Sequence, residues 1–252
     1  MTLHRLYNDL AWLWPVISPP EEYADESGYW RRALWGKLGE GRHRILELGS
    51  GGGHNLSHLT RHFQATAVDL SPHMLRLSTG LNLGVDHHLG DMRSVRLGQT
   101  FDAVLIHDAV SYLLTEEDLK SSLETCRVHL RSGGVLLIAP DWVREDFDGA
   151  TSKQFQWVRK KGRVDVTIDE YLHDPDPDDT QIESIYTYTI KEIGKERVEK
   201  DTHITGLFPI ATWTRLMESA GFRVEMTRLP PNRDGYGGVM FSGVLLPQET
   251  DG

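Results

Sequence analysis

A glycine-rich turn between an apolar segment and a helix-like one constrains the fold of this chain more than any other feature. Residues 45–48 are apolar apart from one glutamate, residues 49–53 comprise four glycines and one serine, and helical spacing of apolar residues begins at His54. This order predicts a strand, a tight turn and a helix. Glycines at such a turn let a ligand approach the bare backbone, and the helix N-terminus offers free N–H groups. The segment therefore predicts a ligand site at a strand end.

The spacing of the glycines narrows the class of ligand. Gly49, Gly51 and Gly53 alternate with other residues, whereas the dinucleotide-binding pattern G-x-G-x-x-G would place its third glycine at His54. Further along the chain, Asp69 closes a second apolar segment. An acidic side chain at the tip of a second parallel strand is placed to accept hydrogen bonds from both hydroxyl groups of a ribose. The two segments together predict a nucleoside site between neighbouring strand ends.

Residues 44–140 alternate between strand-like and helix-like segments. The expected strands end near Leu48, Asp69, His88, His107 and Ala139. The expected helices cover residues 54–63, 72–80 and 116–131. Such alternation predicts an α/β fold, with helices on both faces of a parallel sheet and ligands at the carboxyl ends of its strands.

Two regions fall outside this alternation. Residues 1–40 carry apolar and aromatic side chains at helical spacing, and we interpret them as an N-terminal helical cap with one helix around Tyr7 and another over residues 21–38. Residues 142–206 alternate with a period of two instead. The alternating stretches are 163–168, 182–190 and 196–204, which predicts a three-stranded antiparallel insert that acts as a substrate lid over the active site. Residues 41–141 and 207–252 then form the main domain.

Charge and cysteine content limit the partners and the compartment. The net charge of −10 argues against nucleic acid as a partner, because a phosphate backbone requires a basic face. The apolar residues 10–17 are too few to span a bilayer, and no signal peptide is visible, so we expect a cytoplasmic protein without a membrane partner. The single cysteine, Cys126, excludes an intrachain disulfide and is expected to be a packed core thiol.

Three blocks of the sequence carry a resemblance to a known family. Glu47-x-Gly49-x-Gly51-x-Gly53, then residues 68–71 around Asp69, then residues 90–92 around Asp91 resemble the S-adenosylmethionine (SAM) methyltransferases of the Rossmann-like class. The resemblance implies a seven-stranded, mostly parallel sheet whose last strand is antiparallel. It also implies SAM as cofactor, S-adenosylhomocysteine as product, and a small-molecule methyl acceptor.

The resemblance assigns cofactor contacts residue by residue. It places the backbone of Gly49 and Gly51 against the methionine part, Asp69 on the ribose, and Asp91 on the adenine amino group, with Met92 as a wall of the adenine slot. The residues expected to contact the cofactor are Tyr7, Glu47, Gly49, Ser50, Gly51, Asn55, Asp69, Leu70, Met74, Asp91, Met92, His107 and Asp108. No metal ligands are expected.

The sequence constrains the methyl acceptor and the catalytic residues less than it constrains the cofactor. A sulfonium methyl donor is already activated, so positioning contributes most, and a general base helps when the acceptor is a hydroxyl or a protonated amine. His107 and Tyr112, at the fourth strand tip, and His203 are the candidate catalytic residues. Residues 22–24, 53–56, 140–142 and 201–208 resemble segments of the N,N-dimethyltransferases of nucleotide-linked aminosugars, and that resemblance places His203 near the acceptor.

Several alternatives stay open at this point. The segment from His107 to Val110 replaces a small, serine-rich segment of the aminosugar enzymes, so a sugar nucleotide is one option among small-molecule acceptors. Transfer to nitrogen and transfer to oxygen are both open. The basic residues 159–163 could meet a diphosphate or form a solvated face. A homodimer, a non-catalytic SAM- or nucleoside-binding module and an NAD-linked oxidoreductase are the remaining options.

Overall fold

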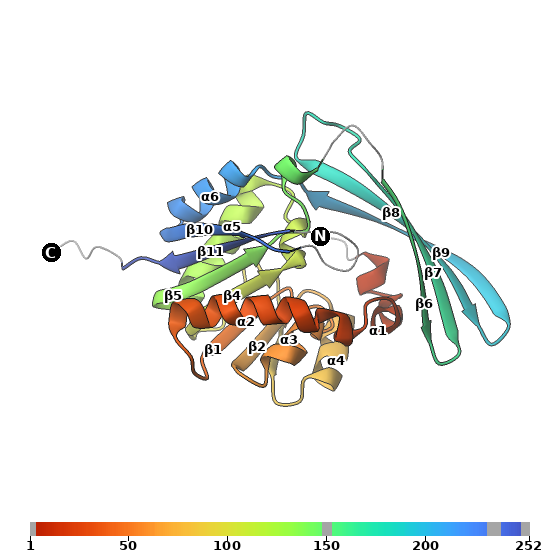
Figure 1. Ribbon diagram of the computed structural model, residues 1–252, viewed down its shortest axis with the longest axis horizontal. Helices are drawn as coiled ribbons and strands as arrows, with labels where there is room; N and C mark the ends of the chain where they lie inside the picture. Colours follow the sequence, from red (N-terminus) through yellow and green to blue (C-terminus); the bar gives the residue numbers. More distant parts are fainter. Residues whose placement is uncertain (1–3, 148–152, 231–237, 248–252) are drawn as a thin grey trace.

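Two separate sheets form the framework of the protein. The computed structural model describes residues 4–147, 153–230 and 238–247. The larger sheet has seven strands in the order β10-β11-β5-β4-β1-β2-β3, and the smaller has four in the order β6-β7-β8-β9 (Figure 1). In the larger sheet β11 is antiparallel to both of its neighbours, and the remaining pairs are parallel. The predicted Rossmann-like sheet with an antiparallel last strand is therefore confirmed.

The strand bounds agree with the sequence prediction in the first half of the chain. The strands of the larger sheet are β1 Arg44–Leu48, β2 Gln64–Asp69, β3 Asp86–Leu89, β4 Phe101–His107, β5 Leu130–Ala139, β10 Phe222–Arg228 and β11 Val239–Leu245. The helices are α1 Trp14–Ile17, α2 Ala24–Leu38, α3 His54–Leu59, α4 Pro72–Leu81, α5 Glu116–His129 and α6 Ile210–Ser219. None of these helices within the described residues is long and apolar enough to cross a membrane.

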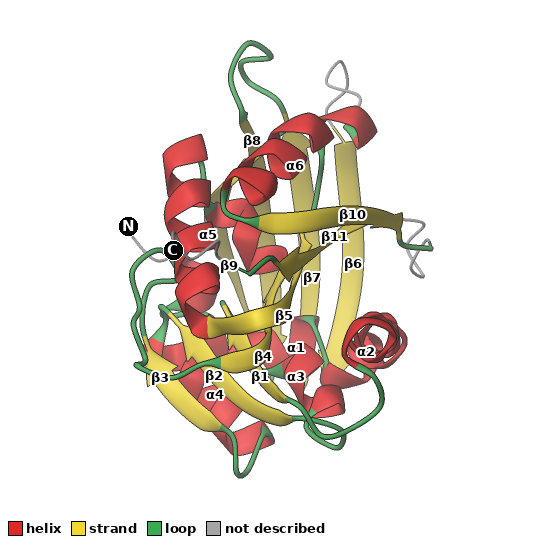
Figure 2. Cartoon of the chain, turned by 90° about the vertical axis from the view of Figure 1, so that its left-hand side faces the viewer, coloured by secondary structure: helices red, strands yellow, loops and turns green. Residues whose placement is uncertain are grey.

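Apolar side chains from both faces of the larger sheet form two cores beneath the helices that cover it (Figure 2). On one face Val104 and Ile106 of β4 pack with Leu123 of α5 and Trp213 of α6. On the other face Leu105 and other strand residues pack with side chains of α2 and α3, including Leu34 and Leu59. Strands buried on both faces need continuous apolar runs, as residues 103–106 show. Cys126 lies in the first core, as expected for a packed thiol.

The smaller sheet differs from the prediction by one strand. Its strands are β6 Lys153–Lys161, β7 Val164–His173, β8 Gln181–Glu192 and β9 Lys195–Gly206, all antiparallel. The unpredicted strand is β6, in which Phe155 and Trp157 alternate with more exposed polar residues. Its charged end obscured this alternation, because residues 159–161 suggested a solvated face or a diphosphate contact instead.

The N-terminal cap is less regular than predicted. A series of short turns replaces the first helix: η1 Arg5–Tyr7, η2 Ala11–Leu13 and η3 Pro20–Tyr23 are 3₁₀ turns around the four-residue α1. Pro19 and Pro20 explain the break between α1 and η3, because proline lacks the N–H that a continuous helix needs, whereas Pro15 lies in the first turn of α1, where proline is tolerated. Leu6 and Leu13 of the cap pack against Val166 and Tyr188 of the smaller sheet. The cap and the insert therefore share one apolar core beside the carboxyl ends of the larger sheet's strands.

Candidate functional site

The carboxyl ends of three neighbouring strands bring the predicted cofactor residues together. Leu48 of β1 lies opposite Val68 of β2, and Glu47 lies opposite Leu105 of β4. The residues that follow these strands therefore emerge at one edge of the sheet (Figure 1). This edge is where α/β folds bind ligands.

The glycine loop after β1 has a backbone that only glycine adopts without strain. Gly49, Gly51 and Gly53 have φ angles of 73°, 53° and 73°. A Cβ atom at Gly49 would lie 2.3 Å from the Cβ of Ala109, so the loop also packs too closely for a side chain there. The loop therefore presents bare backbone at the strand ends, as the sequence predicted.

Asp69 fixes this loop through its carboxylate. Oδ2 accepts a hydrogen bond of 2.7 Å from the N–H of Gly51, and Oδ1 accepts one of 2.7 Å from the N–H of Ser71. Burial raises the pKa of Asp69, while these N–H groups oppose that rise. Each carboxylate oxygen can accept a second hydrogen bond, which leaves capacity for ligand hydroxyl groups. Ser71 caps α4 and also donates its hydroxyl to the carbonyl oxygen of Tyr7.

Buried polar atoms without partners gather around the same loop. Glu47 accepts one hydrogen bond of 3.2 Å from Asn55, but Glu47 Oε2 and Asn55 Oδ1 have none. The hydroxyl of Ser50 and Nδ1 of His54 are likewise buried and unpaired. Burial raises the pKa of Glu47 to about 7. Unpaired buried polar atoms are costly and uncommon, so a cluster of them indicates a place for a polar ligand.

On the predicted adenine side, Asp91 takes part in a network of ion pairs. Its carboxylate pairs with Arg93 at 2.6 Å, and Arg93 also pairs with Asp118 of α5 at 2.7 Å. These hydrogen bonds hold the pKa of Asp91 below its usual range. Met92 lies beside the glycine loop, since its Cε would be 3.0 Å from a Cβ at Gly49. Leu70 follows Asp69 directly and is partly buried.

His107 is held in an ion pair that the sequence did not reveal. Its Nε2 lies 2.7 Å from Glu26 of α2 and 3.2 Å from Asp108. Burial alone would lower the pKa of His107, but the carboxylates of Asp108, Glu26 and Glu47 raise it to about 10. The side chain is therefore an imidazolium near neutral pH and has no free lone pair with which to accept a proton.

Four polar side chains from three distant segments form a continuous hydrogen-bonded chain. The hydroxyl oxygens of Tyr7 and Tyr112 are 2.8 Å apart, and Tyr112 lies 2.7 Å from Nδ1 of His203. Nε2 of His203 lies 2.9 Å from Oδ2 of Asp201, which also accepts the N–H of Leu6 at 2.7 Å. His203 and Asp201 are buried, at 3% and 7% exposure. The structure thus joins the predicted residues Tyr7, Tyr112 and His203, and adds Asp201.

Two aspartates occupy neighbouring strand ends beside this chain. Asp108 follows β4 and Asp141 follows β5, and His107 lies opposite Ala139 in the strand register. The N–H of Asp141 donates to the hydroxyl of Ser111, the residue before Tyr112, across 2.9 Å. Both residues remain accessible to solvent, yet surrounding protein raises the pKa of each. Sequence reasoning gave Asp141 no site role, although its place two residues after a strand end was visible.

The basic residues 159–163 lie at the end of β6, and three of them contact other groups of the protein. Arg159 pairs with Glu22 at 3.4 Å, and Lys160 pairs with Asp165 at 3.0 Å. Lys161 donates to the carbonyl oxygen of Pro15 at 3.3 Å. These contacts favour the solvated-face interpretation over a diphosphate contact.

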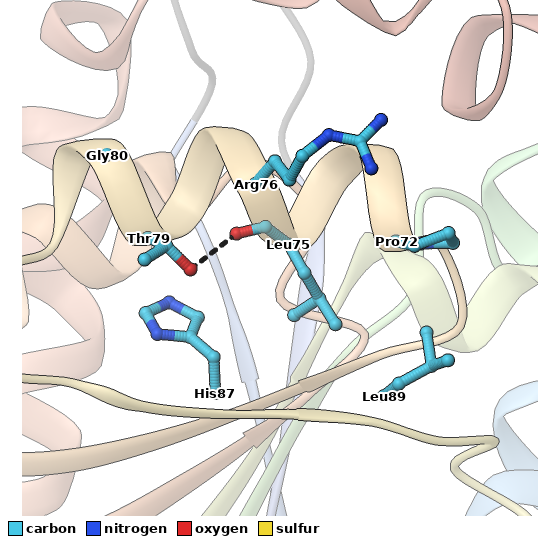
Figure 3. A pocket seen from close by; sticks show the side chains of 7 residues that line it. All are labelled: Pro72, Leu75, Arg76, Thr79, Gly80, His87 and Leu89. Carbon is cyan, nitrogen blue, oxygen red and sulfur yellow. Dashed lines mark hydrogen bonds between the residues drawn. The ribbon is translucent and has the colours of Figure 1, made fainter.

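A shallow hollow of about 660 Å³ lies apart from these strand ends. It is lined by side chains of α4 and β3, among them Arg76, Thr79 and His87 (Figure 3). None of the predicted site residues lines it.

Both the sequence and the fold of this chain are similar to those of known proteins. Residues 45–134 match the model of a methyltransferase domain. The chain is 32% identical over 204 residues to the dTDP-3-amino-3,4,6-trideoxy-alpha-D-glucopyranose N,N-dimethyltransferase of Streptomyces venezuelae, covering 79% of this chain and 82% of that enzyme. This chain belongs to the SAM-dependent methyltransferases. Membership of that family decides against the NAD-linked oxidoreductase and the non-catalytic module considered from sequence.

Solved methyltransferase structures have the same architecture. The crystal structure of DesVI from Streptomyces venezuelae is 28% identical, with a TM-score of 0.78 and coverage of 94% of this chain and 96% of that one. The sugar N-methyltransferase KedS8 from Streptoalloteichus has a TM-score of 0.80 at 24% identity, covering 98% and 95% of the two chains, and shares the fold. In this methyltransferase the unpaired atoms of Glu47, Ser50 and Asn55 suit the charged amino acid end of SAM, while Asp69 has acceptor capacity for a ribose.

Proposed function

We propose that this methyltransferase transfers methyl groups from SAM to the amino group of a nucleotide-linked aminosugar. The observation that carries the proposal is the polar chain of Tyr7, Tyr112 and His203 beside the carboxyl groups of Asp108 and Asp141. A protonated amine is attracted by carboxyl groups, and it must lose a proton before it can attack a methyl group. The dTDP-aminosugar N,N-dimethyltransferases of Streptomyces venezuelae and Streptomyces fradiae are similar over most of this chain, which supports the substrate class.

The proposed donor site is the glycine loop with its neighbours. SAM supplies an electrophilic methyl group on a sulfonium sulfur. We assign the backbone of Gly49, Ser50 and Gly51 to the methionine end, with Glu47 near its ammonium group and Asp69 on the ribose. Asp69 would bind this ribose while it continues to hold the N–H of Gly51 at 2.7 Å. The loop and the ribose would then be positioned by one carboxylate.

The remaining predicted cofactor residues keep their roles as proposals, with two adjustments. Met74, Leu70 and Met92 are assigned to the apolar walls around the adenine. Asp91 would reach the adenine amino group only while paired with Arg93, so its role there would be shared. His107 is assigned to orienting Asp108 and α2 through its ion pair with Glu26, in place of proton transfer.

The insert is proposed to cover the acceptor. Its inner face brings Tyr186 of β8 within 5.0 Å of the ring of His203, and the hydroxyl of Tyr186 donates to Glu170 at 2.8 Å. Burial raises the pKa of Glu170, and the hydroxyl of Ser184 also donates to its carboxyl group at 2.8 Å. We propose that residues 142–206 act as a lid that excludes water, with residues 1–40 as its support; residues 1–3 and 148–152 lie outside the described part of these ranges.

A panel of acceptors tests the proposed function. Purified enzyme and SAM would be incubated with dTDP-3-amino and dTDP-4-amino sugars, with the matching hydroxyl sugars, and with free amines. We expect one and then two added methyl groups on an aminosugar nucleotide, measured by mass spectrometry, and none on the hydroxyl analogue. Methylation of the hydroxyl analogue alone would contradict transfer to nitrogen.

Size-exclusion chromatography in the same buffer would test the homodimer, which remains a prediction, as does the cytoplasmic location.

A further inference from the structure

The hydrogen-bonded chain from Asp201 to Tyr7 has a direction that its end group sets. Burial alone would raise the pKa of Asp201, but hydrogen bonds from His203 and from the N–H of Leu6 hold it below its usual range. Asp201 is therefore a carboxylate and can only accept hydrogen bonds. Nε2 of His203, 2.9 Å away, must carry the hydrogen between them.

The donor and the acceptor of each remaining hydrogen bond in the chain follow from this first one. In the neutral imidazole Nδ1 is left as an acceptor, so Tyr112 donates its hydroxyl hydrogen across 2.7 Å. The oxygen of Tyr112 in turn accepts the hydroxyl hydrogen of Tyr7 across 2.8 Å. The oxygen of Tyr7 therefore keeps lone pairs free for a donor outside the chain. The phenol of Tyr7 bonds to Tyr112 beside His203, and its carbonyl oxygen accepts the hydroxyl of Ser71 near Asp69, so Tyr7 connects the two proposed substrate sites.

We propose that Asp201 is a positioning residue that holds His203 as the Nε2-protonated tautomer, so that Tyr7 and Tyr112 relay a proton from the acceptor amine to Nδ1. This role rests on the proposed function, because it requires an amine acceptor. Asp201 touches neither substrate and acts through His203. The hydrogen-bonding order resembles that in which a buried aspartate orients a catalytic histidine in hydrolases.

The proton transfer balances without any further reactant. The N–H bond of the acceptor ammonium breaks and its electron pair stays on nitrogen, while the proton bonds to the oxygen of Tyr7. The hydrogen of Tyr7 moves to Tyr112, and that of Tyr112 moves to Nδ1 of His203. Both tyrosines end neutral, and the imidazolium is paired with the Asp201 carboxylate. The freed nitrogen pair forms the new bond to the methyl carbon, and the pair of the methyl–sulfur bond returns to sulfur.

Several other titratable groups face His203 and must be considered in a pH profile. They come from every element packed around it: His4, Tyr7, Tyr112, Glu170 and Tyr186. The ring of His4 stacks on that of His203 at 4.3 Å, and its Nδ1 bonds the carbonyl oxygen of Thr202 at 2.9 Å. Burial and the neighbouring His203 lower the pKa of His4, so it is neutral in the working range.

Asp201→Asn tests the positioning role, with Glu199→Gln as its control. Glu199 lies two residues earlier on β9 and pairs with Arg5 of the cap at 2.9 Å, so it shares the cap contact but not the relay. We expect Asp201→Asn to lower kcat at least about tenfold, with little change in KM. Its pH profile should differ from that of the control, because His203 is left without its carboxylate partner. A kcat and pH profile equal to those of Glu199→Gln would overturn the proposal.

A double-mutant cycle separates the relay from a purely structural effect. Residues that act in series lose activity non-additively, so Asp201→Asn should reduce kcat much less in a Tyr112→Phe background than in the wild type. Multiplicative losses would show that Asp201 does not act through Tyr112 and would reject the relay. If the wild-type enzyme methylates no amine, the proposed function fails first, independently of either variant.

The tautomer can be measured without any substitution. Nitrogen-15 spectra of histidine-labelled enzyme at neutral pH should show His203 with a protonated Nε2 and an unprotonated Nδ1, and the opposite tautomer would overturn the proposal.

His4, Asp201 and His203 also place three potential metal ligands within 4.8 Å of one another. Full activity after EDTA treatment is expected. Activity lost to EDTA and restored by Zn²⁺ would assign these residues to a metal and reject the relay.

Discussion

The two sides of the proposed active site satisfy their polar groups in opposite ways. Around the glycine loop, buried atoms of Glu47, Ser50 and Asn55 have no hydrogen-bond partner. On the acceptor side, His203 and Asp201 are equally buried and fully engaged. The difference indicates that the donor side is completed by its ligand, whereas the acceptor side is organised before any ligand binds. Substitutions on the donor side should therefore change affinity, and those among paired groups should change stability or rate.

Gly49→Ala should have the largest effect, because it disturbs the donor side directly. A Cβ with φ at 73° is strained and would lie 2.3 Å from Ala109. We expect a loss of roughly 2–4 kcal/mol in the free energy of unfolding, measured by urea denaturation, and no measurable SAM binding by calorimetry. Gly80→Ala, in α4 with open space around it, is the control and should stabilise by roughly 0.5–1 kcal/mol. Unimpaired SAM binding by the first variant would contradict the donor site.

Asp69→Ala tests whether one carboxylate serves both the loop and the ribose. The variant leaves the N–H of Gly51 and the ribose hydroxyls without their acceptor. SAM should bind more weakly by about 1–3 kcal/mol in calorimetry. Asp69→Asn keeps one acceptor oxygen and should lose less. An unchanged affinity for Asp69→Ala would reject its assignment to the ribose.

Glu47→Gln sharpens the comparison by separating affinity from stability. The pKa of Glu47 is raised from its usual 4.5 to about 7, so ionising it costs stability as pH rises through that range. The variant should therefore unfold no more easily than the wild type at pH 8. Its SAM affinity should fall about 10- to 100-fold, because the cofactor ammonium loses a charged partner. Wild-type affinity should rise through pH 7 and that of the variant should not.

Glu26→Gln, which changes a group that already has a partner, should have the smallest effect of these substitutions. It removes the partner of the buried His107, but Glu26 is partly exposed, so we expect a stability loss of about 1 kcal/mol. The pKa of His107 is raised from 6.5 to about 10, so this contribution is complete below pH 6.5 and vanishes as pH rises towards 10. Thermal melts of both proteins from pH 6 to pH 10 should converge. SAM affinity should not change, and a large change would break the distinction between the two sides.

The sequence predicted the framework of the larger sheet because each of its signals is local. The strand ends at Leu48, Asp69 and His107 follow from apolar runs and the turns after them, and all three are observed. Strand β6 was missed because its charged end outweighed its alternation.

Contacts between distant segments account for most of what sequence reasoning missed at the site. Glu26 is one of several charges on α2, and nothing near it in sequence indicates a buried histidine as its partner. Asp201 and His203 do alternate on one strand, so their shared face was visible, but their contact with Tyr112 was not. The family resemblance identified His203 as a site residue, whereas the hydrogen bonds in the structure identified Asp201.

The hydroxyl of Ser71 has a consequence for the order of catalytic events. Ser71 follows the proposed ribose carboxylate by two residues and donates to the carbonyl oxygen of Tyr7, whose phenol ends the proposed proton path. We therefore expect donor binding to affect Tyr7, the residue proposed to meet the acceptor. Such an enzyme should load its two substrates sequentially, cofactor first, and initial-rate plots with both concentrations varied should intersect instead of running parallel.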